Sequence, residues 1–294
     1  MWPGASILPV HEAGLVAGVP VQGASVELWS HCVSWADLTV PVETGHGAAR
    51  LDLGDDWPDR WSVSWRAGQR AESRSVRELA RMPLAGADPI RAFSWRRGQR
   101  HRPGLEYLVS TGRHHGFESL EEAKTLLALD FAGDLADVVS QPLRLRFGAG
   151  GKRREHTPDF LAVTRSGAWL IDVRPGHLIK EQDAESFAAA AELALACGWR
   201  YTVVGRWRDN VLTAVDTMSS QRRPLSDPLA LRPALLAAAA GGRTFGELAA
   251  ATRCPPVARA QLLHLLWHRQ LGIDMSRPLA DSSAVRLAGP GALR

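Results

Sequence analysis

The stretch 157–175, TPDFLAVTRSGAWLIDVRP, decides how this chain is expected to fold. It contains two short runs rich in apolar residues, at 157–163 and 168–173, joined by residues 164–167. Two such runs with so short a connection predict an antiparallel β-hairpin. Charged residues interrupt the apolar pattern at the ends of the hairpin, and we expect functional residues at these positions.

Three charged residues stand at those ends. Asp159 follows Pro158 at the start of the first strand, and Asp172 and Arg174 are two residues apart on the second. Side chains two apart on a strand leave the same face. Paired carboxylates beside a cation are suited to holding Mg²⁺, or Mn²⁺ in its place, near a phosphate. The alternative is a turn cap at Asp159 and a surface ion pair between Asp172 and Arg174. An unpaired Asp172 would be costly to bury in its apolar run.

The patterns around the hairpin predict a mixed α/β domain. Residues 118–130 have helical spacing, and residues 138–147 read as a strand that a loop at 148–154 follows. Beyond the hairpin, residues 183–197 read as an amphipathic helix and residues 200–205 as a buried strand. The resulting order of helix, three strands, helix and strand predicts a mixed sheet flanked by helices.

Further segments surround this domain. We expect a tail at 1–20, a β-rich region at 21–92, the mixed domain at 93–219, a linker at 220–227 and a winged-helix-like domain at 228–294. In the β-rich region, Val26 and Leu28 alternate, and so do Trp61, Val63 and Trp65.

The winged-helix-like domain is expected from three helical patterns, at 229–240, 244–252 and 256–271, and a strand-like tail. Thr244 and Glu247 have the spacing of a capping box. The polar residues of the third helix suit either DNA bases or a protein partner, and we favour protein contact or structural support. They are Arg259, Gln261, His264, His268 and Arg269.

Composition limits the classes of function. Of the 35 basic residues only Lys124, Lys152 and Lys180 are lysines, and arginine suits phosphate, although GC-rich coding also favours arginine. No apolar run reaches the roughly 18 residues that cross a bilayer, and the N-terminus lacks a basic signal start. The three dispersed cysteines fit neither a zinc site nor a disulfide framework. We therefore expect a cytoplasmic protein without a membrane partner.

Five motifs in order resemble the TnsA-type endonuclease subunit of heteromeric transposases, in its actinobacterial form. They are FESLEE at 117–122, SQP at 140–142, HTPDF at 156–160, IDVRP at 171–175 and GWRYTVV at 198–204. The resemblance implies a PD-(D/E)xK, restriction-endonuclease-like fold that nicks double-stranded DNA at transposon ends with metal-activated water. It implies a DDE-type transposase and an AAA+ ATPase as partners. It also implies Glu122, Asp159 and Asp172 as Mg²⁺ ligands, with Arg174 in the place of the family's lysine.

Several assignments stay open. Glu118 shares a helix face with Glu122, although a solvated face is the simpler interpretation for Glu118. Gln141 suits either a hydrogen bond near the site or an ordinary strand position, and Lys180 is an alternative cation to Arg174. Because arginine keeps its proton, Arg174 is expected to stabilise charge rather than act as a base.

Two other functions are compatible with the same residues. The first is a restriction-like or defence nuclease without a transposase partner. The second is a non-catalytic DNA-binding or scaffold protein that retains the nuclease fold.

The histidines do not predict a zinc site. His114, His115 and His156 lack zinc spacing and are expected to be turn or surface residues.

Overall fold

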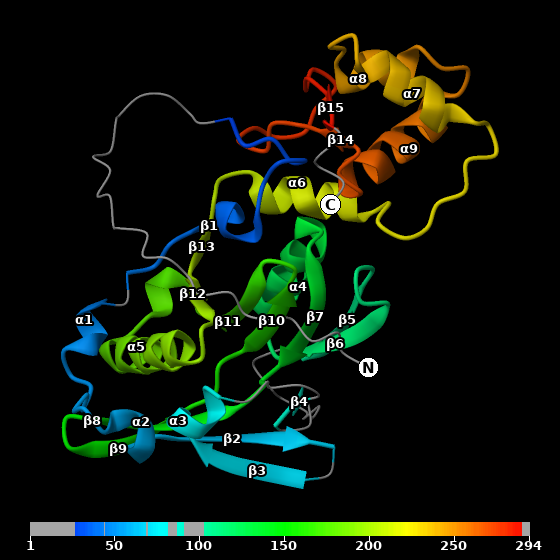
Figure 1. Cartoon of the computed structure of the whole chain (residues 1–294). Helices are drawn as coiled ribbons and strands as arrows, with labels where there is room; N and C mark the ends of the chain where they lie inside the picture. Colours follow the sequence, from blue (N-terminus) through cyan, green and yellow to red (C-terminus); the bar gives the residue numbers. More distant parts are fainter. Residues whose placement is uncertain (1–26, 44, 69, 82–86, 91–102, 290–294) are drawn as a thin grey trace.

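The computed structural model describes residues 27–43, 45–68, 70–81, 87–90 and 103–289 and has a mixed α and β fold (Figure 1). The predicted tail at 1–20 and Val26 lie outside the described residues. Two larger sheets organise the described part of the chain, and the C-terminal helices lie at the end of the molecule opposite the second sheet (Figure 1). No helix in the described ranges combines the length and apolarity that crossing a membrane requires.

The central sheet contains the predicted hairpin. Its strand order is β12-β11-β10-β7, with β7 at Leu135–Ser140, β10 at Phe160–Thr164, β11 at Gly167–Val173 and β12 at Arg200–Val204. β10 and β11 are antiparallel, whereas β11 and β12 are parallel. The predictions of an antiparallel hairpin and a mixed sheet are therefore confirmed, although the strands extend further and leave a shorter turn than the predicted connection.

Two helices cover opposite faces of this sheet because its apolar residues alternate. Phe160 and Ile171 belong to the core that includes α4 (Leu120–Ala132). Leu161 and Leu170 belong to the core that includes α5 (Glu181–Ala196). Both helices lie within two residues of the ranges that the sequence predicts. Each apolar face of the sheet is thereby removed from water, which is the main favourable contribution to folding.

The second sheet joins the N-terminal region to the central segment. Its strand order is β3-β2-β8-β9, with β4 also beside β2. The strands are β2 at Ser62–Ala67, β3 at Arg70–Ser75, β4 at Ala87–Asp88, β8 at Arg144–Ala149 and β9 at Lys152–His156. β2 pairs with β8 antiparallel, with Val63 opposite Leu145. The sheet therefore crosses the boundary expected near residue 93. The predicted alternation of Trp61, Val63 and Trp65 is confirmed, since all three are buried.

Two predictions for residues 138–154 are wrong. The expected single strand at 138–147 is divided between β7 and β8, which belong to different sheets. The division falls at Gln141, whose φ is +48°, and at Pro142, which has no amide hydrogen for a ladder. The expected loop at 148–154 is mostly strand. Gly150 and Gly151, with φ of +56° and +70°, turn the chain tightly enough for β9 to return along β8.

Shorter elements complete the N-terminal and central parts. They are η1 at Trp35–Leu38, β1 at Thr39–Val40, α1 at Gly45–Ala48, α2 at Trp57–Arg60, α3 at Val76–Leu79, β5 at Gly104–Leu108, β6 at Arg113–Phe117, η2 at Gly176–Leu178 and β13 at Arg206–Trp207. β1 pairs with β13, and Leu28 lies in no strand.

The C-terminal part contains the three expected helices. They are α7 at Leu231–Ala239, α8 at Phe245–Ala250 and α9 at Pro255–Trp267, and they follow α6 at Val211–Ser219, which the sequence did not reveal. The capping box of Thr244 and Glu247 is confirmed. The strand-like tail is reduced to two short strands, β14 at Leu271–Gly272 and β15 at Arg286–Leu287.

The polar residues of α9 and its end have structural partners. Gln261 and His264 are buried, and Arg259 pairs with Asp281 at 2.6 Å. Arg269 donates hydrogen bonds to the carbonyl oxygens of Ala132, at the end of α4, and Val33, the latter at 2.7 Å. These contacts give the residues a role in holding the C-terminal part of the fold together.

Candidate functional site

A cleft of about 590 Å³ lies where the hairpin of β10 and β11 meets the first turn of α4. Six carboxylates line it, together with Arg174 and His156; they are Glu118, Glu121, Glu122, Asp159, Asp172 and Asp183. The folded chain therefore brings together all four residues to which the sequence assigned catalysis, from three separate segments. The cleft carries a large excess of acidic side chains.

Asp159 lies just before β10 and is held by the main chain. Its Oδ2 accepts a hydrogen bond of 2.7 Å from the amide of Val173. Burial raises the pKa of Asp159 well above its ordinary value of 3.8, and the charges of Asp172, Glu122 and Glu118 raise it further against the effect of the Val173 hydrogen bond. The carboxylates of this cleft are thus close enough to oppose one another's ionisation.

Asp172 is 2% exposed and has two side-chain partners. Nε2 of His156 lies 3.0 Å from both of its carboxylate oxygens, and the hydroxyl of Tyr201 donates to Oδ2 at 2.7 Å. A buried carboxylate needs such donors. The alternative interpretation, a surface ion pair between Asp172 and Arg174, is therefore wrong, because Asp172 is buried with His156 and Tyr201 as partners and Arg174 lies beside Asp183.

The sequence missed the roles of His156 and Tyr201. His156 was expected at the surface, but it lies at the end of β9 and faces inward, with its ring against Phe187 of α5. Its place three residues before Asp159 was the available signal. Tyr201 lies on β12, and only the parallel pairing of β11 with β12 brings it beside Asp172. Burial and the neighbouring Asp172 raise the pKa of Tyr201, so its hydroxyl keeps the proton that it donates. His115, also expected at the surface, is buried and lies 2.8 Å from Thr111 Oγ1.

Glu122 has a structural role as well as a place in the cleft. Its Oε1 accepts from Ser119 Oγ at 2.9 Å, and its Oε2 accepts from the amide of Glu118 at 2.8 Å. Ser119 Oγ in turn accepts from the amide of Glu122, which caps α4. The S-x-x-E motif at 119–122 therefore stabilises the start of the helix. Glu118 and Glu122 both line the cleft, and Glu122 is the more buried of the two.

The predicted cations are placed differently. Arg174 lines the cleft, but its Nε lies 3.5 Å from Asp183 of α5. Lys180 stands before α5, is exposed, and is not part of the cleft lining. Gln141 is also outside the lining. Its buried backbone supports the site, since its amide donates to the carbonyl oxygen of Asp159 at 2.7 Å.

The donor chemistry of the cleft suits a hard divalent cation. Mg²⁺ and Mn²⁺ prefer carboxylate oxygens, and a cation would relieve the repulsion that raises the pKa of Asp159. Within the described ranges, no three His, Cys, Asp or Glu side chains stand in an arrangement ready to hold a metal ion.

A larger cleft of about 770 Å³ lies at the other end of α4 and includes Arg269. Two of its charged residues, Asp130 and Arg269, are engaged with the main chain. Asp130 accepts from the amides of Val109 and Ser110 at 2.9 and 2.8 Å, and Arg269 donates to carbonyl oxygens. We interpret this cleft as a junction between the central and C-terminal parts of the chain.

Comparison with known proteins identifies no relative: no protein-family model and no curated protein matches the chain. The chemistry of the cleft between α4 and the hairpin is therefore the feature of this protein that indicates a function.

Proposed function

We propose that this protein is a Mg²⁺-dependent endonuclease that hydrolyses a phosphodiester bond of double-stranded DNA, with a restriction-endonuclease-like core. The observation that carries the proposal is the convergence of Asp159, Asp172 and Glu122 on one cleft that also holds Arg174. Three carboxylates and a cation from a helix and two adjacent strands are the groups that metal-dependent phosphodiester hydrolysis needs.

Electrostatics supports a cation in this cleft. Six carboxylates face Arg174 and His156, so a phosphate would meet net repulsion in the cleft alone. We infer that Asp159 and Asp172 hold Mg²⁺ and that Glu122 is the third ligand. When bound, Mg²⁺ would supply a water of lowered pKa and neutralise charge on the scissile phosphate.

The chain's own residues have separate roles in this proposal. Asp159 would hold the cation in its ionised form, because a metal binds the deprotonated carboxylate. Asp172 is oriented by Tyr201 and His156, and an ionised carboxylate has about four lone-pair positions, so acceptor capacity remains for a cation. Arg174 stays protonated and stabilises the charge that develops on the phosphate.

We further propose that the protein is a TnsA-like subunit that nicks transposon ends in the cytoplasm beside a DDE-type transposase and an AAA+ ATPase. The support is the resemblance of five motifs, three of which supply Glu122, Asp159, Asp172 and Arg174 to the cleft. Nicking of transposon ends only when both partners are added would support this assignment. Nicking by the isolated protein at unrelated sites would favour a restriction-like or defence nuclease.

One set of contacts favours a second candidate, a non-catalytic DNA-binding or scaffold protein. Both oxygens of Asp172 already have donors, and Arg174 is near Asp183 instead of Asp172. A chain that had lost its chemistry would keep such contacts, because they satisfy buried charge without a metal.

Mn²⁺ binding by calorimetry separates the two candidates. The proteins compared are the wild type, Asp159→Asn, Asp172→Asn and the control Glu121→Gln, which changes a carboxylate of the same cleft that pairs with Lys124. The endonuclease proposal expects binding by the wild type and the control and its loss in both Asn variants. Failure of the wild type to bind Mn²⁺ with duplex DNA present would overturn the proposal. Plasmid nicking by the same four proteins then tests the reaction.

A further inference from the structure

The β8–β9 hairpin presents its basic residues on two different faces. Residues 144–155, RLRFGAGGKRRE, contain five basic residues and one acidic residue. Successive side chains on a strand point to opposite faces. Leu145 and Phe147 are buried against the core that includes α5, so Arg144 and Arg146 point away from it.

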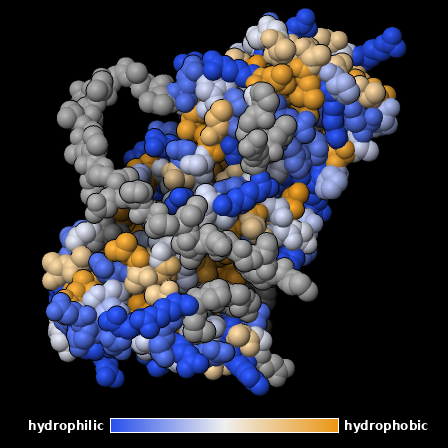
Figure 2. All heavy atoms as spheres, viewed as in Figure 1, coloured by the Kyte–Doolittle hydropathy of each residue, from blue (hydrophilic) through white to orange (hydrophobic). Residues whose placement is uncertain are grey.

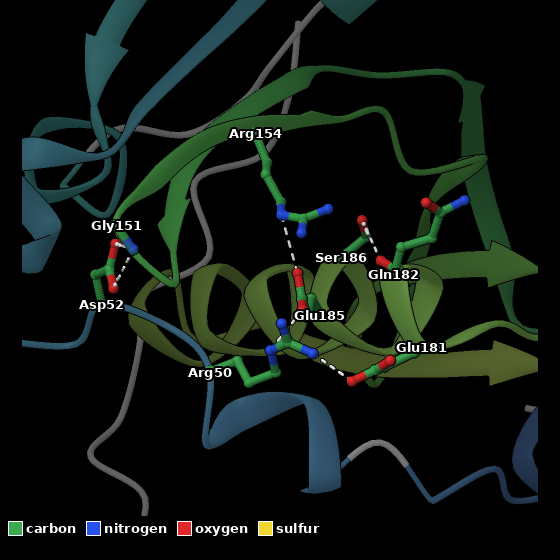
Figure 3. Close-up of polar contacts among 8 residues, drawn as sticks. All are labelled: Arg50, Asp52, Gly151, Arg154, Glu181, Gln182, Glu185 and Ser186. Atoms are coloured by element: carbon green, nitrogen blue, oxygen red, sulfur yellow. Dashed lines mark hydrogen bonds and ion pairs between the residues drawn. The ribbon is translucent and has the colours of Figure 1, made fainter.

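Arg154 belongs to the inner face and is a structural residue. It lies opposite Phe147 in the β8–β9 ladder, and its Nε is 2.9 Å from Oε2 of Glu185, which is 2% exposed. Arg50 approaches Glu185 from the other side, with its Nε 3.0 Å from Oε1 (Figure 3). The tip of the hairpin is held as well, because the amide of Gly151 donates to Asp52. The hairpin is thus fixed on the molecule.

The outer face of the sheet is rich in arginine and serine. Cross-strand pairing aligns Ser62 with Arg146 and Ser64 with Arg144, and Ser64 also pairs with Ser73 of β3. The arginines are exposed, with 40% of the Arg144 side chain and 54% of the Arg146 side chain accessible. In the view of Figure 2, hydrophilic residues gather along the edge of the molecule where Figure 1 places β2, β3, β8 and β9.

No described helix covers this outer face. The buried residues of α3 and the partly buried residues of α1 and α2 belong with α5 to the core on the inner side. The outer face carries four arginines, Arg66, Arg144, Arg146 and Arg153, and two acidic residues, Glu155 and Asp88. Glu155 pairs with Arg146 at 2.6 Å and lies 3.9 Å from Arg144, so the face keeps an excess of positive charge. Arginine and serine side chains are among the groups that contact nucleic-acid phosphates. The positive charge and the hydrogen-bond donors of this face therefore favour a polyanion as its binding partner.

We propose that the outer face of this sheet, defined by Ser62, Ser64, Ser73, Arg144, Arg146 and Arg153, binds the phosphate backbone of duplex DNA. The inference rests on the proposed function in one respect, that the bound polyanion is duplex DNA. β9 carries Arg153 on the outer face and ends at His156, which lines the cleft from the inner side, so the DNA-binding face and the cleft lie on opposite sides of this strand.

The test is the salt dependence of binding to a fluorescein-labelled duplex, measured by anisotropy. The double variant Arg144→Gln/Arg146→Gln is compared with the wild type and with the control Arg206→Gln/Arg277→Gln, whose exposed arginines lie outside this sheet. Removing two phosphate contacts should weaken binding and reduce the slope of log K against log salt by about 1.8, since each contact contributes about 0.9. The control should keep the wild-type affinity, with at most a small change in slope.

Three results of the anisotropy experiment would overturn the inference. It fails if the double variant binds with the wild-type slope, if the control weakens binding equally, or if the wild type does not bind the duplex, in which case an acidic protein becomes the better partner for this face. Calorimetry with Mn²⁺ on the same double variant distinguishes failure of this inference from failure of the proposed function. If the double variant binds Mn²⁺ as the wild type does but has lost DNA binding, both proposals are supported. If the wild type binds no Mn²⁺ but its DNA binding depends on Arg144 and Arg146, only the nuclease proposal is contradicted.

Discussion

The hydroxyl of Tyr201 donates a 2.7 Å hydrogen bond to Oδ2 of Asp172, from one parallel strand to its neighbour. His156 approaches the same carboxylate from the opposite sheet, 3.0 Å from each oxygen. A carboxylate accepts only, so both neighbours act as donors. Their joint effect is to fix the orientation of a buried charge that we propose as a ligand of Mg²⁺.

Tyr201→Phe should therefore weaken metal binding. It removes one donor and leaves the ring in place, and the loss of a group that orients a metal ligand commonly lowers affinity by about 10- to 100-fold. Calorimetry with Mn²⁺ measures the change. Tyr107→Phe is the matched control, because Tyr107 packs against His114 away from the cleft. Equal affinities in the two variants would contradict an orienting role for Tyr201.

Asp159→Asn should stabilise the protein at neutral and alkaline pH in the absence of metal. Burial and the adjacent carboxylates raise the pKa of Asp159 above its ordinary value of 3.8, so the folded state holds this proton more tightly than the unfolded chain. The stability gained from the proton is complete below about pH 3.8 and is lost as pH rises through the raised pKa. Asparagine resembles the protonated acid and keeps an oxygen for the Val173 amide.

Thermal unfolding of the wild type and Asp159→Asn between about pH 4 and pH 9 checks this expectation, because buried carboxyl groups titrate over this range. The difference in Tm in favour of the variant should grow with pH. A constant difference across the series would show that Asp159 does not titrate in that range.

Arg174→Ala should slow DNA nicking by about 10²- to 10³-fold, the usual effect of removing one donor to developing negative charge. Metal binding should persist, because the carboxylate beside Arg174 is Asp183, which is not one of the proposed ligands. Arg174→Lys keeps the charge and should recover part of the rate. Wild-type nicking by the Ala variant would remove Arg174 from the mechanism.

Arg154→Ala and Arg153→Ala should differ strongly in stability although the residues are neighbours. Arg154 is paired with the buried Glu185, and removing one partner of a buried ion pair costs about 3 kcal/mol of folding free energy. The cost should be somewhat smaller here, because Arg50 still pairs with Glu185. Arg153 is exposed on the outer face, and its loss should change the free energy of unfolding by less than about 0.5 kcal/mol. Urea denaturation of both variants makes the comparison, and similar values would contradict the assigned faces.

Arg269→Gln should destabilise the fold by about 1–3 kcal/mol, because two carbonyl oxygens lose a charged donor. Duplex affinity should be unchanged. Arg253→Gln, an exposed change in the same part of the chain, serves as the control and should leave stability within about 0.5 kcal/mol of wild type. A loss of DNA binding without a loss of stability would instead place Arg269 in a DNA interface.

Local pattern alone determined much of this protein. The alternation of Trp61, Val63 and Trp65, the hairpin at 157–173, the helix at 183–197 and the capping box of Thr244 could all be predicted. Each depends on residues a few positions apart, whose periodicity decides which face is buried. The same reasoning selected Asp159 and Asp172, and the resemblance to the TnsA-type family implied Glu122; all three line one cleft.

Only the tertiary structure decided the partners of those residues. The division of 138–147 between two sheets, the contact of Arg174 with Asp183 and the hydrogen bonds of Asp172 with His156 and Tyr201 depend on which strands are neighbours and in which register. Register is set by the burial of apolar residues from segments far apart in the chain, and shifting a strand by one residue reverses the face of every side chain. The sequence thus indicated four of the charges that the cleft contains, and the packing of distant strands determined what those charges contact.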